Sequence, residues 1–167
     1  FSMRCMSLDL FAGEAKFRDE TSGDEWDIDA DHFYGTDGAF SEVRHTMMMN
    51  DRFDYSQTYL EHGYKELSIP AAEDGGFRLE KNALHIWPRG GYMLIALPNL
   101  DGSFTVTLFL SFEGKRSFEN LNTETEVLDF FNEVFPDAVP HMPTLVEDFF
   151  KNPTASLVTV KCCPWAY

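Results

Sequence analysis

The sequence predicts an α+β fold, in which helices cover one face of a mainly antiparallel sheet. Between residues 58 and 110, segments rich in aromatic and branched side chains follow one another at short intervals. Parallel strands need a long crossover connection, so segments this close together favour antiparallel pairing. After residue 123 the apolar residues recur at helical spacing instead of alternating. At 167 residues the chain is long enough to bury a hydrophobic core.

The strand segments are bounded by Gly, Pro, Asn or Asp, which are residues that end strands and begin turns. Residues 99–102, "NLDG", lie between two of these segments and predict a hairpin turn. The loosely alternating residues 2–19 predict one or two strands, the polar residues 19–31 a turn-rich connection, and residues 32–35 a short buried strand. The remaining predicted strands span residues 58–70, 83–88, 92–99, 103–110 and 155–163.

Three helices are predicted where apolar residues recur every three or four positions. The first spans 40–49, the second 124–137 and the third 144–152. Asn122 or Thr123 is a suitable N-cap for the second helix, because each side chain can accept a hydrogen bond from a free backbone N–H. The apolar face of the first helix comprises Phe40, Val43, Met47 and Met48. The apolar face of the second comprises Val127, Phe130, Phe131 and Val134.

The charge balance excludes two classes of partner. Asp and Glu outnumber Lys and Arg by 28 to 13, which gives a formal net charge of -15. Nucleic acids and anionic membranes both attract basic surfaces, so neither is an expected partner. Hydrophobic residues make up 44% of the chain and include 16 Phe, a composition typical of a folded globular protein.

The cysteines and the hydropathy pattern bear on location. Cys162 and Cys163 are adjacent and Cys5 is far from both, so no disulfide framework or zinc site is indicated and reduced thiols are expected. No apolar run approaches the ~18 residues of a membrane span, and the first residues lack the order of a signal peptide. A cytoplasmic location is therefore the default expectation. The chain starts at Phe1 and stops in an apolar segment, so we expect an internal part of a longer polypeptide.

Familiar catalytic and metal-binding motifs are absent from the sequence. Asp27, Asp29 and Asp31 resemble the start of a calcium loop, but His32 and Gly38 occupy the positions that need Gly and Glu. The five histidines do not form the paired spacing of a zinc enzyme, and no Gly-rich phosphate loop or nucleophile elbow is present. We therefore assign neither a metal ligand nor a catalytic residue.

A Gly-Thr-Asp-Gly turn at residues 35–38 is the most informative short segment. It joins an apolar segment to a predicted helix, the kind of place where α/β folds bind anionic groups. Gly38 permits close approach of a ligand, Ser41 offers a hydroxyl and Arg44 a positive charge, while Asp37 can accept a hydrogen bond from a sugar hydroxyl. An ordinary turn with an exposed arginine fits the same residues, and this alternative stays open.

Asp37, Gly38, Ser41 and Arg44 match the Asp-Gly motif of the flavin-dependent aromatic hydroxylases. Longer segments resemble the branch of this family that hydroxylates L-kynurenine, over residues 52–70, 80–110, 130–140 and 145–163. The resemblance implies FAD and NADPH as cofactors, with the four motif residues near the cofactor pyrophosphates. It also implies a small aromatic substrate and, in eukaryotic relatives, attachment to the outer mitochondrial membrane through a segment outside this chain.

The resemblance further implies two domains and a substrate surface. Residues 1–50 correspond to a remnant of the FAD-binding domain, and residues 51–167 to the substrate-binding sheet domain. Positions that line the ring pocket in the family correspond to Leu84, Ile95, Leu97 and Phe109, although their alternation fits an ordinary sheet core equally well. The family's Gly-x-Gly-x-x-Gly turn, its substrate-carboxylate clamp and its later Gly-Asp motif are outside the chain. The missing flavin domain is expected to pack on the sheet, and the fragment alone is not expected to catalyse a reaction.

Two further interpretations stay open. Because the carboxylate clamp is outside the chain, a related flavin hydroxylase with another aromatic substrate fits the same residues. A stand-alone module that binds an aromatic ligand fits only if Phe1 and Tyr167 are natural ends.

Overall fold

The computed structural model describes residues 2–167 and divides them into two compact units. The first unit comprises residues 2–58 and 158–167, and the second comprises residues 59–157. Strands β4 (Asp54–Ile69) and β8 (Thr154–Cys163) contribute residues to both units. Residues 158–167 thus return to the first unit, which the sequence did not indicate. The assignment of residues 1–50 to a FAD-binding domain stays a prediction.

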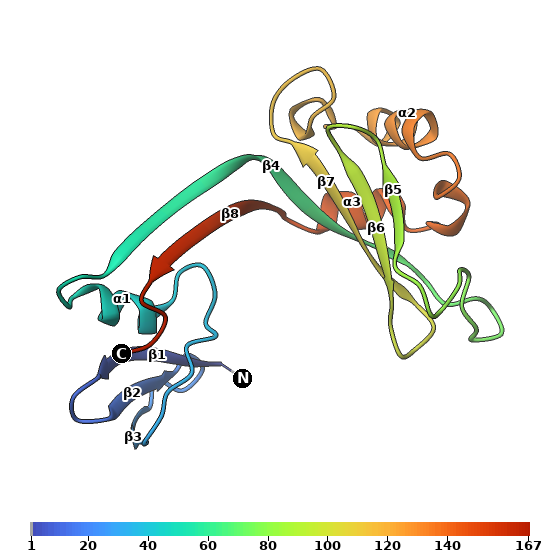
Figure 1. Cartoon of the computed structure of the whole chain (residues 1–167). Helices are drawn as coiled ribbons and strands as arrows, with labels where there is room; N and C mark the ends of the chain where they lie inside the picture. Colours follow the sequence, from blue (N-terminus) through green and yellow to red (C-terminus); the bar gives the residue numbers. More distant parts are fainter. Residues whose placement is uncertain (1) are drawn as a thin grey trace. The chain divides into compact units, whose positions relative to one another are not determined.

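The second unit is built on a five-stranded sheet with the strand order β5-β6-β7-β4-β8. Strands β5 (His85–Pro88), β6 (Met93–Pro98) and β7 (Phe104–Ser111) pair antiparallel with their neighbours, and β7 pairs antiparallel with β4. The turn between β6 and β7 is the predicted hairpin, since the Asn99 N–H donates to the Ser103 carbonyl at 2.8 Å. The predicted α+β class and the antiparallel pairing are confirmed (Figure 1).

Helices α2 (Glu124–Val134) and α3 (Leu145–Lys151) cover one face of this sheet, which we call the inner face (Figure 1). Thr123 is the N-cap of α2: its hydroxyl accepts from the Glu126 N–H, and the Glu126 carboxylate accepts from the Thr123 N–H. This reciprocal pair is a capping box, and it fixes the start of the helix. The buried core between helices and sheet includes Leu67, Ile69, Leu94, Phe104, Val106, Leu108, Phe131 and Phe135.

Polar contacts attach α3 to β4. The Lys65 ammonium donates to the carbonyls of Phe149 and Asn152, both at 2.8 Å, so it satisfies carbonyls at the end of the helix. Ser68 donates to the Asp148 carboxylate through its backbone N–H and through its hydroxyl. Because Lys65 is only 6% exposed, its stem belongs to the core while its charge is used by backbone carbonyls.

The hairpin after β6 packs closely on the loop at residues 70–76. Gly102 has a φ of +87°, and a Cβ there would lie 2.7 Å from the Gly75 carbonyl oxygen. Only glycine fits both the left-handed backbone and this close approach.

The first unit contains a three-stranded antiparallel sheet of β1 (Met3–Asp9), β2 (Glu14–Asp19) and β3 (Glu25–Asp29). The prediction of one or two strands within residues 2–19 is confirmed, because β1 and β2 both lie there. The polar, turn-rich connection predicted at residues 19–31 begins with a turn, but as a description of the whole segment the prediction is wrong, because β3 lies within it and pairs with β2. Its residues are polar because both faces of this edge strand are exposed.

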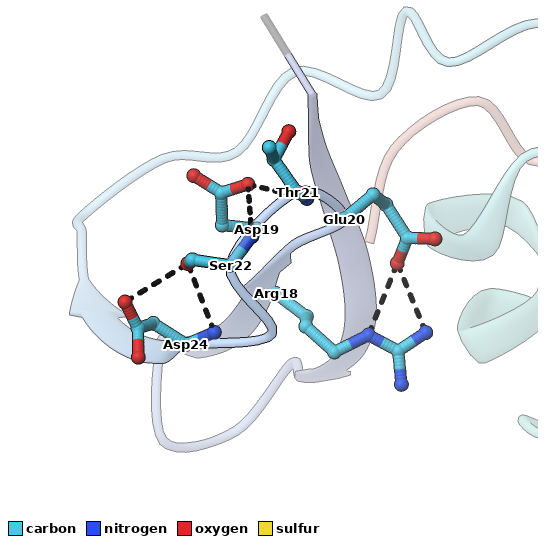
Figure 2. Close-up of polar contacts among 6 residues, drawn as sticks. All are labelled: Arg18, Asp19, Glu20, Thr21, Ser22 and Asp24. Atoms are coloured by element: carbon cyan, nitrogen blue, oxygen red, sulfur yellow. Dashed lines mark hydrogen bonds and ion pairs between the residues drawn. The ribbon is translucent and has the colours of Figure 1, made fainter.

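The turn between β2 and β3 is held by side-chain contacts (Figure 2). The Asp19 carboxylate accepts from the N–H groups of Thr21 and Ser22, and the Ser22 hydroxyl donates to Asp24. These short-range bonds replace the backbone pairing that the turn residues lose.

Helix α1 (Glu42–Met48) follows a loop rather than a strand. The predicted buried strand at residues 32–35 is wrong: these residues have no strand pairing, and Tyr34 is 86% exposed. The aromatic residues that suggested a strand lie mostly on the surface of this unit. Within the described residues, no helix is both long and apolar enough to cross a membrane.

Candidate functional site

The face of the five-stranded sheet opposite α2 and α3, which we call the outer face, is the first candidate surface. Residues of β7 alternate between the two faces, and Phe104, Val106, Leu108 and Leu110 are buried in the core. Thr105, Thr107, Phe109 and Ser111 therefore point to the outer face, where each is only partly buried.

Register places the predicted substrate residues together on this outer face. Ile95 is opposite Thr107, and Leu97 is opposite Thr105. Phe109 is opposite Met93 on one side and Tyr64 on the other, and its ring centre lies 6.4 Å from that of Tyr64. The structure therefore brings three of the four residues onto adjacent strands.

Leu84, the fourth residue, directly precedes β5 and is 52% exposed. Its neighbour His85 contacts the core residue Phe104, so alternation directs Leu84 to the outer face. Leu97 is 44% exposed, and neither residue belongs to the buried core. An ordinary core position therefore does not explain the apolar character of these side chains.

Sequence reasoning missed other outer-face residues. Ile86 is opposite Ile95 and is 52% exposed, and Met93 is opposite Phe109. Their alternation with Trp87, Leu94 and other inward residues was visible in the sequence. What the sequence did not reveal was which of the two faces the helices cover.

An open groove of about 560 Å³ lies at one end of this face, within the second unit. Phe109 and Met93 line it together with the Gly90–Gly91 turn and His62. The His62 Nε2 atom is 2.7 Å from the Gly91 carbonyl oxygen and 3.2 Å from the Ser111 hydroxyl. The groove has an apolar lining with a few polar groups, which is typical of sites for small aromatic ligands.

The Asp-Gly turn of the first unit is the second candidate surface. The Asp37 carboxylate accepts from the Glu42 N–H at 2.8 Å and lies 3.5 Å from the Val43 nitrogen. The Ser41 hydroxyl accepts from the Arg44 N–H at 3.0 Å, which makes Ser41 the N-cap of α1. Both side chains thus satisfy backbone groups of the following helix.

Arg44 stabilises the same turn through hydrogen bonds to its backbone. Its Nη1 and Nη2 atoms donate to the carbonyls of Gly38 and Ala39, at 3.4 and 2.5 Å. Its guanidinium carbon lies 4.9 Å from the centre of the Tyr55 ring. The Arg44 Nε atom is buried and makes no hydrogen bond within residues 2–167.

Gly38 exposes its backbone at the tip of the turn. It has a φ of +81°, and no atom lies within 4 Å of the position that a Cβ would occupy. Gly38, Ser41 and Arg44 line a cavity of about 550 Å³ within the first unit. The turn therefore leaves room for a ligand beside its backbone, while its side chains are engaged in internal hydrogen bonds.

The hydrogen bonds of the turn also set the charge of Asp37. Partial burial alone would raise the pKa of this carboxyl. Hydrogen bonds from the Ser41 hydroxyl and from nearby backbone N–H groups outweigh that effect and hold the pKa below its usual value. Asp37 is consequently ionised at neutral pH, and its charge is directed at α1.

A metal centre is not apparent in the described residues. No three His, Cys, Asp or Glu side chains among residues 2–167 are arranged to hold an ion.

Comparison with known proteins identifies a group of similar sequences. The chain is 58% identical over 149 residues to a protein named kynurenine 3-monooxygenase in Flavobacterium psychrophilum, covering 89% of this chain and 33% of that protein. The kynurenine 3-monooxygenase of Dictyostelium discoideum is 52% identical over 167 residues, which cover 100% of this chain and 35% of that protein. The chain thus spans about a third of the length of these relatives.

No protein-family model matches the sequence. Among solved structures, the flavin-dependent monooxygenase PieE, in complex with FAD and substrate, aligns with a TM-score of 0.48 and 12% identity, covering 95% of this chain and 26% of that one. Similarity of this size supports no statement about function. Over nearly its whole length, this chain is similar to about a third of proteins named kynurenine 3-monooxygenase, which confirms the resemblance of the sequence to that group.

Proposed function

We propose that these residues belong to a flavin-dependent monooxygenase that hydroxylates L-kynurenine at ring position 3, using NADPH and O₂. The observation that carries this proposal is the 58% identity over 149 residues to a protein of that name. Identity of this extent includes both the Asp-Gly turn and the sheet, and so exceeds what a shared motif explains. Since the chain covers a third of its relatives, we assign the activity to the complete protein and not to these residues alone.

In this proposal the outer face holds the aromatic ring. Leu84, Ile95, Leu97 and Phe109 provide apolar contacts, and another part of the protein, the flavin domain, covers them. Exposed apolar side chains in this number are typical of a surface that another domain or ligand covers. A bound flavin would activate O₂ so that one of its oxygen atoms is transferred to the ring, and the task of this face would be to orient the ring and exclude water.

The Asp-Gly turn is proposed to lie at the FAD or NADPH pyrophosphate. The open space beside Gly38 fits such a group, because a phosphate can approach a backbone that lacks a side chain. We assign Asp37, Ser41 and Arg44 to the same site as residues that hold the turn in shape. Their hydrogen bonds to Glu42, Arg44 and Gly38 support this indirect role.

The test is an assay of the complete protein that carries these residues. We expect bound FAD, NADPH oxidation that kynurenine stimulates, and 3-hydroxykynurenine as product by chromatography and mass spectrometry. Stimulation by another aromatic amine or acid, with none by kynurenine, would instead support a related hydroxylase. Absence of flavin from the purified protein would contradict both.

A further inference from the structure

The outer face of β7 carries three hydroxyl groups, and only one of them lacks a partner within residues 2–167. The Thr105 hydroxyl is bonded to the Asn99 amide at 3.2 Å, and the Ser111 hydroxyl lies 3.2 Å from His62 Nε2. Thr107 lies between them on the same strand, and none of the hydrogen bonds found among residues 2–167 involves its hydroxyl.

The position of Thr107 makes this free hydroxyl informative. Ile95 is directly opposite Thr107 on β6, and Phe109 follows two residues later on the same face. Directly opposite residues have Cβ atoms about 4.5–5.5 Å apart, so the hydroxyl lies within reach of anything that contacts Ile95. It is thus a directional polar group among the apolar residues proposed to hold the ring.

Apolar contacts alone do not fix the rotation of a flat ring within its plane. A single well-placed hydrogen bond does, and ligand sites commonly combine an apolar lining with a few such groups. In L-kynurenine the ring amine is attached to the carbon next to position 3. A residue that holds this amine would therefore determine which ring carbon is presented for hydroxylation.

We propose that the Thr107 Oγ1 atom accepts a hydrogen bond from the ring amine of the substrate and so orients the ring on the outer face. This inference rests on the proposed function and names a specificity-determining contact within it. The competing acceptor is Glu66, which is opposite Thr107 on β4. Its exposed carboxylate is better suited to the substrate's α-ammonium group, because an ion pair is favoured over a bond to a neutral amine.

The experiment compares Thr107→Val with wild type in the complete enzyme, by the dissociation constants of kynurenine and of an analogue whose ring amine is replaced by hydrogen. Val keeps the shape of Thr and its preference for strands, so folding is expected to survive. We expect the dissociation constant of kynurenine to rise about three- to tenfold, which corresponds to one neutral hydrogen bond. With the analogue, wild type and Thr107→Val should be equal, because the bond is absent from both.

Thr105→Val is the matched control, since Thr105 shares the strand and the face but is bonded to Asn99. Thr105→Val should lose little affinity, and equally little for kynurenine and for the analogue. Thr107→Ser, which keeps the hydroxyl, should keep the preference for kynurenine. An equal loss with kynurenine and analogue would overturn the proposal. The proposal would also be overturned if Glu66→Gln abolished the preference for kynurenine over the analogue while Thr107→Val left that preference unchanged. If wild type does not hydroxylate kynurenine at all, the proposed function fails instead.

Discussion

The ammonium group of Lys65 lies 4.6 Å from the centre of the Phe149 ring and donates a hydrogen bond to the carbonyl of the same residue. One side chain on β4 thereby holds both the side chain and the backbone of α3. The burial that this requires lowers the pKa of Lys65. The contact joins residues 84 positions apart in the sequence.

Replacing Lys65 by Met should destabilise the second unit. Met fills much of the same space but leaves the carbonyls of Phe149 and of the C-cap residue Asn152 without their donor, so we expect a loss of about 1.5–3 kcal/mol in unfolding free energy. Chemical denaturation of the complete protein measures it. Lys151→Met, at an exposed position of α3, is the control and should change stability little. Equal losses for the two variants would show that Lys65 has no special role.

Phe109→Ala should affect the substrate more than stability. Phe109 points to the outer face, whereas Phe104, five residues earlier on the same strand, is fully buried. We expect Phe104→Ala to cost about 3–5 kcal/mol, as for a core Phe, and Phe109→Ala to cost clearly less. Phe109→Ala should instead raise the kynurenine KM or lower the yield of product per NADPH. A stability loss as large as that of Phe104→Ala, with unchanged kinetics, would make Phe109 a packing residue.

Arg44→Ala should weaken retention of FAD or of NADPH, because the carbonyls of Gly38 and Ala39 lose their common donor. Lys in place of Arg44 should restore little of this affinity, since an ammonium group cannot reproduce the planar fork of a guanidinium. Flavin content after dialysis and titration with NADPH measure the two affinities. Unchanged values for both cofactors would rule out a role of Arg44 in the proposed site.

Asp37 should make stability depend on pH. Its pKa is lower in the folded protein than the ordinary value of about 3.9, so its contribution is present above that value and is lost as the pH falls through the folded pKa. We expect Asp37→Asn to be less stable than wild type at neutral pH and the difference to shrink below about pH 4. Denaturation across this range measures it, with Asp129→Asn on α2 as a control for an exposed carboxylate. A difference independent of pH would show that the charge of Asp37 does not matter.

The regular parts of the second unit were predictable because their signals are local. Alternation identified β4 to β7, and Thr123 was correctly one of two expected caps of α2. Lys65 was not predictable, since a charged residue at an inward position makes sense only when the end of α3 is known to lie beside it. The error at residues 32–35 arose from aromatic residues that suggested burial but lie on the surface.

For the candidate site, too, the features set by neighbouring residues were predictable from the sequence, and those set by distant parts of the chain were not. Resemblance selected Ile95, Leu97 and Phe109, and alternation suggested that they share a face. Whether that face is core or surface depends on where two helices from residues 124–151 pack, and no pattern within the strands contains that information. The uncommitted hydroxyl of Thr107 became visible only when its neighbours' partners were known.

The close approach at Gly102 has a consequence for how this part of the protein can change over evolution. Surface loops usually tolerate insertions and exchange of residues, because few atoms constrain them. The hairpin after β6 and the loop at residues 70–76 leave no room for even a methyl group between Gly102 and Gly75. The two loops therefore behave as one piece, in which a lengthening of either would have to be matched by a change in the other.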